Sequence, residues 1–64
     1  MKQNKFLKGC LNRLLSGENE GVQFNGFTAK LLNNPFVGKI IVIEKDGKIW
    51  QRRTVDAAAA IMEA

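Results

Sequence analysis

The stretch GKIIVIEKDGKIWQRRTVDAAAAIM, residues 38–62, decides the fold. Four β-branched residues at positions 40–43 favour a strand, because such side chains are stiff and pack well on a pleated surface. Asp46-Gly47 follows, and Asp-Gly between two apolar runs is a strong signal for a tight hairpin turn. We therefore predict two antiparallel strands, at about residues 38–45 and 48–53.

The length of this turn decides which face of the sheet carries the tryptophan. A two-residue turn places Ile43 opposite Trp50, whereas a three-residue turn with a glycine bulge places Val42 there. A slip of one residue moves every side chain of one strand to the other face. We favour the bulged form, because it pairs Glu44 with Lys48 across the strands.

A short helix at about residues 55–63 follows the hairpin. Thr54 is suited to the N-cap, since its hydroxyl can accept a hydrogen bond from an unpaired amide of the first turn. Asp56 lies in that turn, where the helix dipole favours a negative charge. The alanines at positions 57–60 are strong helix formers.

The residues before the hairpin predict a helix and one strand. Residues 4–15 have the apolar spacing of an amphipathic helix. Residues 22–32 read as a strand, in which we interpret Asn25-Gly26 as a bulge rather than a tight turn. A turn at residues 33–35 comes next, and we expect Phe36 and Val37 to fold under the core.

The predicted fold is α+β, with an N-terminal amphipathic helix, a three-stranded antiparallel meander and a C-terminal helix in a single small domain, residues 1–64. Residues 40–43 are apolar on both faces, which leaves two arrangements open. One helix can cover each face, or both can cover one face and leave Trp50 or part of the isoleucine run exposed. A core of this size contributes roughly 3–5 kcal/mol, so we also expect that a homodimer can form.

The composition argues against catalysis and metal binding. The chain contains no histidine and no tyrosine, and its single cysteine is Cys10. The usual groups for acid–base chemistry and zinc coordination are therefore missing, and we expect no enzyme activity, cofactor or metal. No apolar run approaches the roughly 18 residues that span a bilayer, and the N-terminus does not read as a cleaved signal, so a cytoplasmic location is expected.

A basic cluster around the hairpin is the main functional candidate. The formal net charge is +4 and the sequence pI is about 9.7, which favours polyanions. Cations interleaved with an aromatic ring suit a nucleic-acid surface, where they neutralise phosphates while the ring stacks on a base. An alternative interpretation is that the tryptophan belongs to the core and the cations protect a strand edge. The residues are Lys39, Lys45, Lys48, Trp50, Arg52 and Arg53.

Residues 27–64, with the motif KDGKIWQRRTVDAAAA, resemble the small DNA-binding modules of the AP2 and integrase arm-binding class. They are also similar to a small bacterial cell-division activator of that shape. The resemblance implies a three-stranded sheet that enters the major groove and reads bases from one face. The residues that would make those contacts are Lys39, Lys48, Trp50, Arg52 and Arg53.

The alternative function is that of a protein-binding adaptor or inhibitor, of the kind that small phage and mobile-element genes encode. Such a protein would use an exposed apolar sheet face or the C-terminal helix. We expect a bacterial or phage origin for either function. The position of Trp50 distinguishes them: exposed beside Arg52 it favours nucleic acid, whereas buried it leaves only general basicity.

Overall fold

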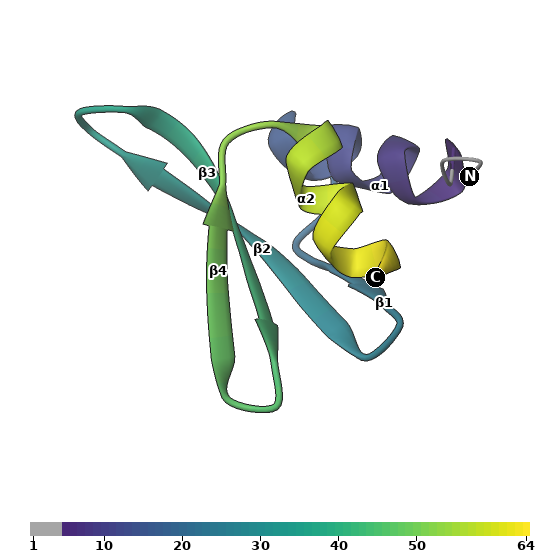
Figure 1. Cartoon of the computed structure of the whole chain (residues 1–64). Coiled ribbons are helices and arrows are strands. Elements are labelled where there is room, and N and C mark those ends of the chain that lie inside the picture. Colours follow the sequence, from purple (N-terminus) through teal and green to yellow (C-terminus); the bar gives the residue numbers. More distant parts are fainter. Residues whose placement is uncertain (1–4) are drawn as a thin grey trace.

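The computed structural model describes residues 5–64 and places two helices around a four-stranded antiparallel sheet (Figure 1). The strands neighbour one another in chain order. The α+β class and the order helix, strands, helix are confirmed, but the sheet has four strands instead of three. Residue 4, the predicted start of the first helix, lies outside the described residues. The elements are α1 (Lys5–Leu15), β1 (Val22–Phe24), β2 (Phe27–Asn34), β3 (Gly38–Lys45), β4 (Lys48–Arg52) and α2 (Val55–Glu63).

The predicted bulge at Asn25-Gly26 is wrong, because these two residues form a tight hairpin turn. Asn25 has φ 54° and Gly26 has φ 81°. A two-residue hairpin turn requires such left-handed values, which asparagine and glycine tolerate best. Phe24 pairs directly with Phe27 across the turn. The short strand β1 is held by burial, since Val22 is 7% exposed and Phe24 packs against the core.

The bulged turn favoured for the second hairpin is also wrong. Asp46 (φ 52°) and Gly47 (φ 81°) form a two-residue turn, and Glu44 lies opposite Ile49 instead of Lys48. This register places Trp50 beside Ile43 on the core side of the sheet. Burial of a large apolar side chain contributes about 1.5–3 kcal/mol, whereas a cross-strand ion pair contributes about 0.2–1 kcal/mol. Burial therefore sets the register.

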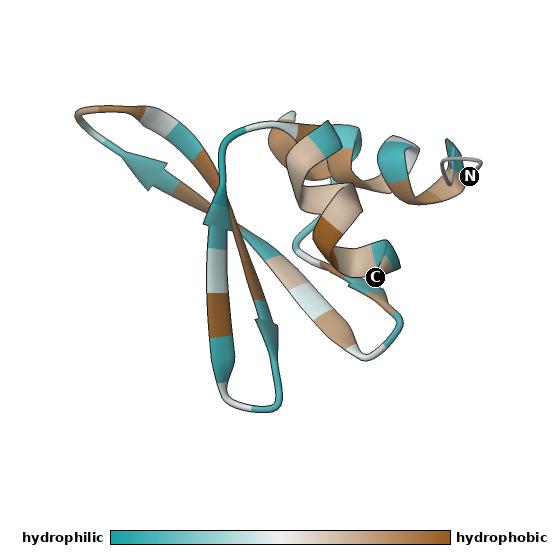
Figure 2. Ribbon diagram, viewed as in Figure 1, coloured by the Kyte–Doolittle hydropathy of each residue, from teal (hydrophilic) through white to brown (hydrophobic). Residues whose placement is uncertain are grey.

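Both helices cover the same face of the sheet, as in the second of the two arrangements left open. The exposure expected with it is not seen, because Trp50 and Val42 are half-buried and the isoleucines at positions 40, 41 and 43 are buried. α1 and α2 contact each other and pack over the sheet (Figure 1). In Figure 2, α2 and much of β3 are apolar. The small side chains of Ala58 and Ala59, both essentially buried, let α2 approach closely. The rest of the core is formed by Leu7, Leu11, Leu14, Val22, Phe27, Ala29, Ile41, Ile43 and Met62.

Polar contacts fix the helices at their ends. Thr54 caps α2 as predicted, its Oγ1 accepting from the Ala57 amide at 3.1 Å. Asn25 Nδ2 donates to the Met62 carbonyl at 3.0 Å, which ties the β1–β2 turn to the last turn of α2. Lys8 Nζ lies 2.8 Å from Asp56 Oδ1 and joins the two helices.

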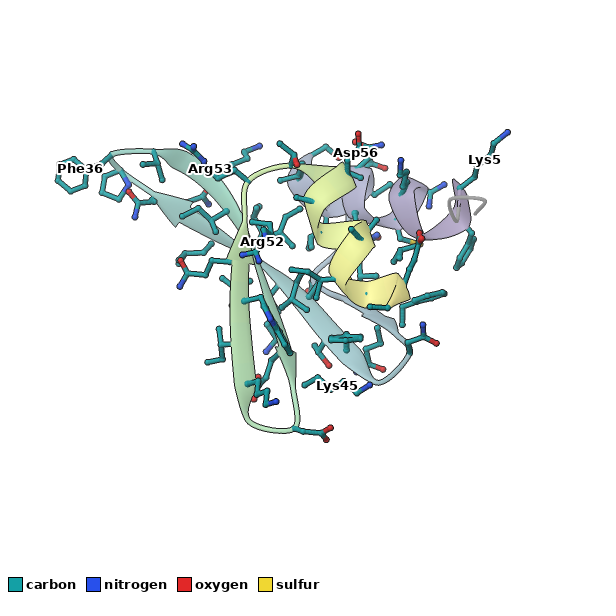
Figure 3. The ribbon with its side chains drawn as sticks, in the orientation of Figure 1. Lys5, Phe36, Lys45, Arg52, Arg53 and Asp56 are labelled. Atoms are coloured by element: carbon teal, nitrogen blue, oxygen red, sulfur yellow. The ribbon has the colours of Figure 1, made fainter. Side chains whose placement is uncertain are left out.

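The expectation that Phe36 and Val37 fold under the core is wrong. Phe36 is 93% exposed and Val37 is 49% exposed. The Asn34 side chain accepts hydrogen bonds from both of their amides, at 2.8 Å and 3.1 Å. These bonds hold the loop in a local turn of the kind that asparagine favours. The β2–β3 hairpin extends beyond the helices, with Phe36 at its tip (Figures 1 and 3).

Candidate functional site

All of the predicted site residues except Arg53 lie on the helix-covered side of the sheet. Successive side chains of a strand alternate between faces. Lys39 and Lys45 share the parity of the core residues Ile41 and Ile43 in β3. In β4, Lys48 lies opposite Lys45, Trp50 opposite Ile43 and Arg52 opposite Ile41. These three side chains therefore lie on the same side of the sheet as their partners. Arg53 follows the last residue of β4.

Trp50 is half-buried and belongs to the edge of the core. Its ring meets the ring of Phe27 edge-on, with centroids 5.6 Å apart and an angle of 63° between the planes. Phe27 itself is buried. An edge-to-face pair of this kind contributes about 0.5–1.5 kcal/mol beyond the area buried. Part of the Trp50 ring therefore packs against Phe27, and only the remaining part is accessible to a ligand.

Lys45 and Lys39 have partners inside the molecule. The Lys45 Nζ lies 4.5 Å from the centroid of the Phe27 ring, within the range of a cation–π contact. The Lys39 Nζ donates to the Leu15 carbonyl at 2.7 Å. This carbonyl is at the C-terminus of α1, where carbonyls lack helical partners and a positive charge is favoured. The two lysines lie at opposite ends of β3, about 20 Å apart for a strand that rises ~3.4 Å per residue.

Four cations of the predicted set are exposed, namely Lys39, Lys48, Arg52 and Arg53, whereas Lys45 is half-buried. The Arg52 Nη1 donates to the Gln51 carbonyl at 2.7 Å. Figure 3 shows Arg52 along β4 beside α2. Lys48 lies directly opposite Lys45 at the hairpin turn. Lys45 and Lys48 therefore lie together at the hairpin turn, whereas Arg52 lies at the other end of β4, opposite Ile41 and nearer to Lys39.

The opposite side of the sheet, which no helix among residues 5–64 covers, has an apolar stripe. We call it the helix-free face. Leu32 is 45% exposed and Ile49 is 62% exposed, while Val42 between them is half-buried. Leu32 pairs with Ile40, which is buried although it lies on this side. The stripe crosses β2, β3 and β4 diagonally.

The polar residues of the helix-free face carry little net charge. Lys30 on β2 contributes one positive charge, and Glu44 on the adjacent strand β3 contributes one negative charge. The neutral residues around them are Gln23, Thr28 and Gln51. A surface of this composition offers phosphates a single cation, so it is chemically distinct from the helix-covered side, where the other strand cations lie.

The helix-free face could not be located from the sequence. The apolar residues on both parities of positions 40–43 were a signal that both sides of β3 need cover. Deciding which side the helices take requires the register of the β3–β4 turn, and the bulged register favoured from the sequence is wrong. Within residues 5–64, no cluster of histidine, cysteine or acidic residues could hold a metal ion, and no helix is long and apolar enough to cross a bilayer.

Comparison of the chain with models of protein families, with curated proteins and with solved structures gives no match.

Proposed function

We propose that this protein is a small, non-catalytic protein-binding module that docks a partner protein on its helix-free face. The observation that carries the proposal is the exposure of Leu32 and Ile49 on a face that neither α1 nor α2 covers. Contiguous exposed apolar side chains, rimmed by polar ones, are typical of protein interaction sites.

Burial on a partner would favour binding through these same residues. Complete burial of an apolar side chain contributes about 1.5–3 kcal/mol, and Leu32 and Ile49 retain roughly half of their surface for this purpose. A sheet face with apolar side chains and balanced charge matches another protein surface better than a polyanion. We further propose that the protein is of bacterial or phage origin and acts in the cytoplasm, where Cys10 stays a free thiol.

The test compares Leu32→Glu with Gln23→Glu, which adds the same charge to an exposed position elsewhere on the face. Each protein is used to capture partners, and a captured partner is then purified and titrated against all three proteins. We expect Leu32→Glu to weaken binding at least tenfold, since it places a charge in a desolvated interface. Gln23→Glu should change binding little.

A partner that binds the wild type and Leu32→Glu equally well would contradict docking on this face. Sedimentation of the wild-type protein alone, over a range of concentrations, shows whether the partner is a second copy of the chain. In that case Leu32→Glu should convert a dimer to a monomer, and Gln23→Glu should not.

Nucleic-acid binding is the second candidate, favoured by the exposed cations Lys48, Arg52 and Arg53 along β4 and directly after it. We propose a salt titration of binding to a mixed-sequence duplex, followed by Trp50 fluorescence. Binding through these cations should weaken steeply with salt, and Arg52→Ala with Arg53→Ala should flatten that dependence. Affinity that survives the double substitution would exclude the β4 cations as the binding surface.

A further inference from the structure

β4 is an edge strand with an open outer side. It pairs with β3 on one side and with no strand on the other among residues 5–64. Because the turn has two residues, the flanking pair, Lys45 and Lys48, exchanges backbone hydrogen bonds. Hydrogen-bonded and non-hydrogen-bonded pairs then alternate along the two strands. Ile49 and Gln51 are consequently the residues of β4 whose amides and carbonyls point away from β3. Both are exposed.

One of these outward groups is already occupied by a neighbouring side chain. The Arg52 guanidinium donates to the Gln51 carbonyl at 2.7 Å. A strand that paired with this edge would have to displace the guanidinium in order to donate its own amide to the carbonyl. A carboxylate on the incoming strand would give the displaced guanidinium a new partner, whereas a neutral strand would not.

The charge on the edge also discriminates between partners. If β4 paired antiparallel with β4 of a second copy, centred on Trp50, Lys48 would lie opposite Arg52 twice. Like charges directly opposite each other destabilise a strand pair. An acidic residue at each of those two positions would instead form two cross-strand ion pairs. In this register the edge therefore disfavours a second copy and favours an acidic strand.

We propose that the β4 edge binds an extended acidic segment of another protein, which adds a fifth strand to the sheet. The segment has carboxylates at two positions four residues apart, facing Lys48 and Arg52. An apolar residue between them contacts the exposed part of Trp50, and another lies beside Ile49 on the helix-free face. Main-chain hydrogen bonds to Ile49 and Gln51 supply the affinity, and the side chains supply the specificity.

This surface differs from the one in the proposed function, with which it shares only Ile49 and Gln51. A partner could use either surface without the other. Leu32→Glu should therefore leave binding of the acidic segment unchanged while it removes docking on the helix-free face. Failure of one proposal is in this way distinguishable from failure of the other.

The experiment uses the whole chain and the heptapeptide acetyl-TETVVET-amide, whose two glutamates face Arg52 and Lys48 in antiparallel pairing. Nuclear magnetic resonance follows the amides of β4. We expect slower hydrogen exchange of the Ile49 and Gln51 amides in the complex, because these amides become ladder donors. The Trp50 amide, already directed at β3, should change little. The peptide with lysines in place of the glutamates should bind roughly tenfold more weakly or worse.

Backbone methylation separates strand addition from simple charge attraction. Methylation of the third and fifth peptide amides, which face Gln51 and Ile49, should abolish binding. Methylation of the fourth amide, which points away from β4, serves as the matched control and should preserve it. Equal binding of all the methylated peptides would overturn the proposal, as would unchanged exchange of the two amides or no binding at millimolar peptide.

Discussion

At the residue scale, the two glycines that follow Asn25 and Asp46 determine where the strands begin and end. Both have a positive φ, and both complete two-residue turns. The sequence identified the Asp46-Gly47 turn from its dipeptide alone. It did not resolve Asn25-Gly26, because a three-residue strand has little pairing of its own, and only the burial of Val22 and Phe24 under the helices stabilises it.

Replacement of Gly47 by alanine tests the backbone requirement at the second turn. A Cβ there would meet no atom within 4 Å, so the expected cost is conformational alone. We expect a loss of about 1–2 kcal/mol, measured as a lower Tm in thermal unfolding. Gly9→Ala in α1 is the matched control, because a Cβ there also meets no atom within 4 Å. It should stabilise the protein by about 0.5–1 kcal/mol. A Tm lowered equally by both would contradict the assigned turn.

Lys39 illustrates a site residue whose role depends on the fold. The sequence grouped it with the basic cluster, but its ammonium donates to the last turn of α1. Lys39→Met retains most of the stem and removes the charge, and we expect it to cost about 0.3–1 kcal/mol of unfolding free energy, less at high salt. Lys30→Met on the helix-free face should cost less in the same denaturant titration. The reverse order would show that the Lys39 contact contributes nothing to stability.

At the element scale, β4 is both a half-buried strand and a sheet edge. Its existence and length follow from the sequence, but its register does not, because the favoured ion pair between Glu44 and Lys48 is weaker than the burial of Trp50 against Phe27. Lys48 and Arg52 share one side of the strand in any register, because they are four residues apart. The register decides that this side is the helix-covered one, which could be inferred only from the structure.

Arg52→Glu tests whether charge controls pairing at this edge. In a β4–β4 pair it would place the new carboxylate opposite Lys48 twice, and we expect this variant to self-associate on the order of tenfold more strongly at low salt than the wild type. Lys48→Glu combined with Arg52→Glu restores like charges and should stay monomeric, although its net charge is nearer zero. Sedimentation equilibrium measures both. Stronger association of the double variant would indicate a general charge effect instead of strand pairing.

At the scale of the whole molecule, two helices on one side of a sheet leave the other side without cover. Ile41 and Val42 are adjacent in the sequence, yet Ile41 is fully buried beneath the helices and Val42 lies on the helix-free face. The sequence showed that both sides of β3 are apolar. It could not show that the two helices pack against each other, because the alanines of α2 have no strong preference for one face.

Truncation of these two neighbours should therefore have unequal effects. Ile41→Ala leaves a cavity in the core and should cost about 2–5 kcal/mol, enough to unfold much of a domain this small. Val42→Ala should cost less than about 1 kcal/mol, since its side chain remains partly in water. Urea unfolding followed by Trp50 fluorescence compares the two, and equal losses would mean that β3 is covered on both sides.

The exposure of the helix-free face is measured most directly by methyl resonances in the presence of a water-soluble paramagnetic probe, at low protein concentration. We predict strong broadening of the methyl signals of Leu32, Val42 and Ile49, and weak broadening of those of Ile41, Ile43 and Met62. Equal protection of both groups would contradict a free apolar face and, with it, the proposed docking of a partner protein there.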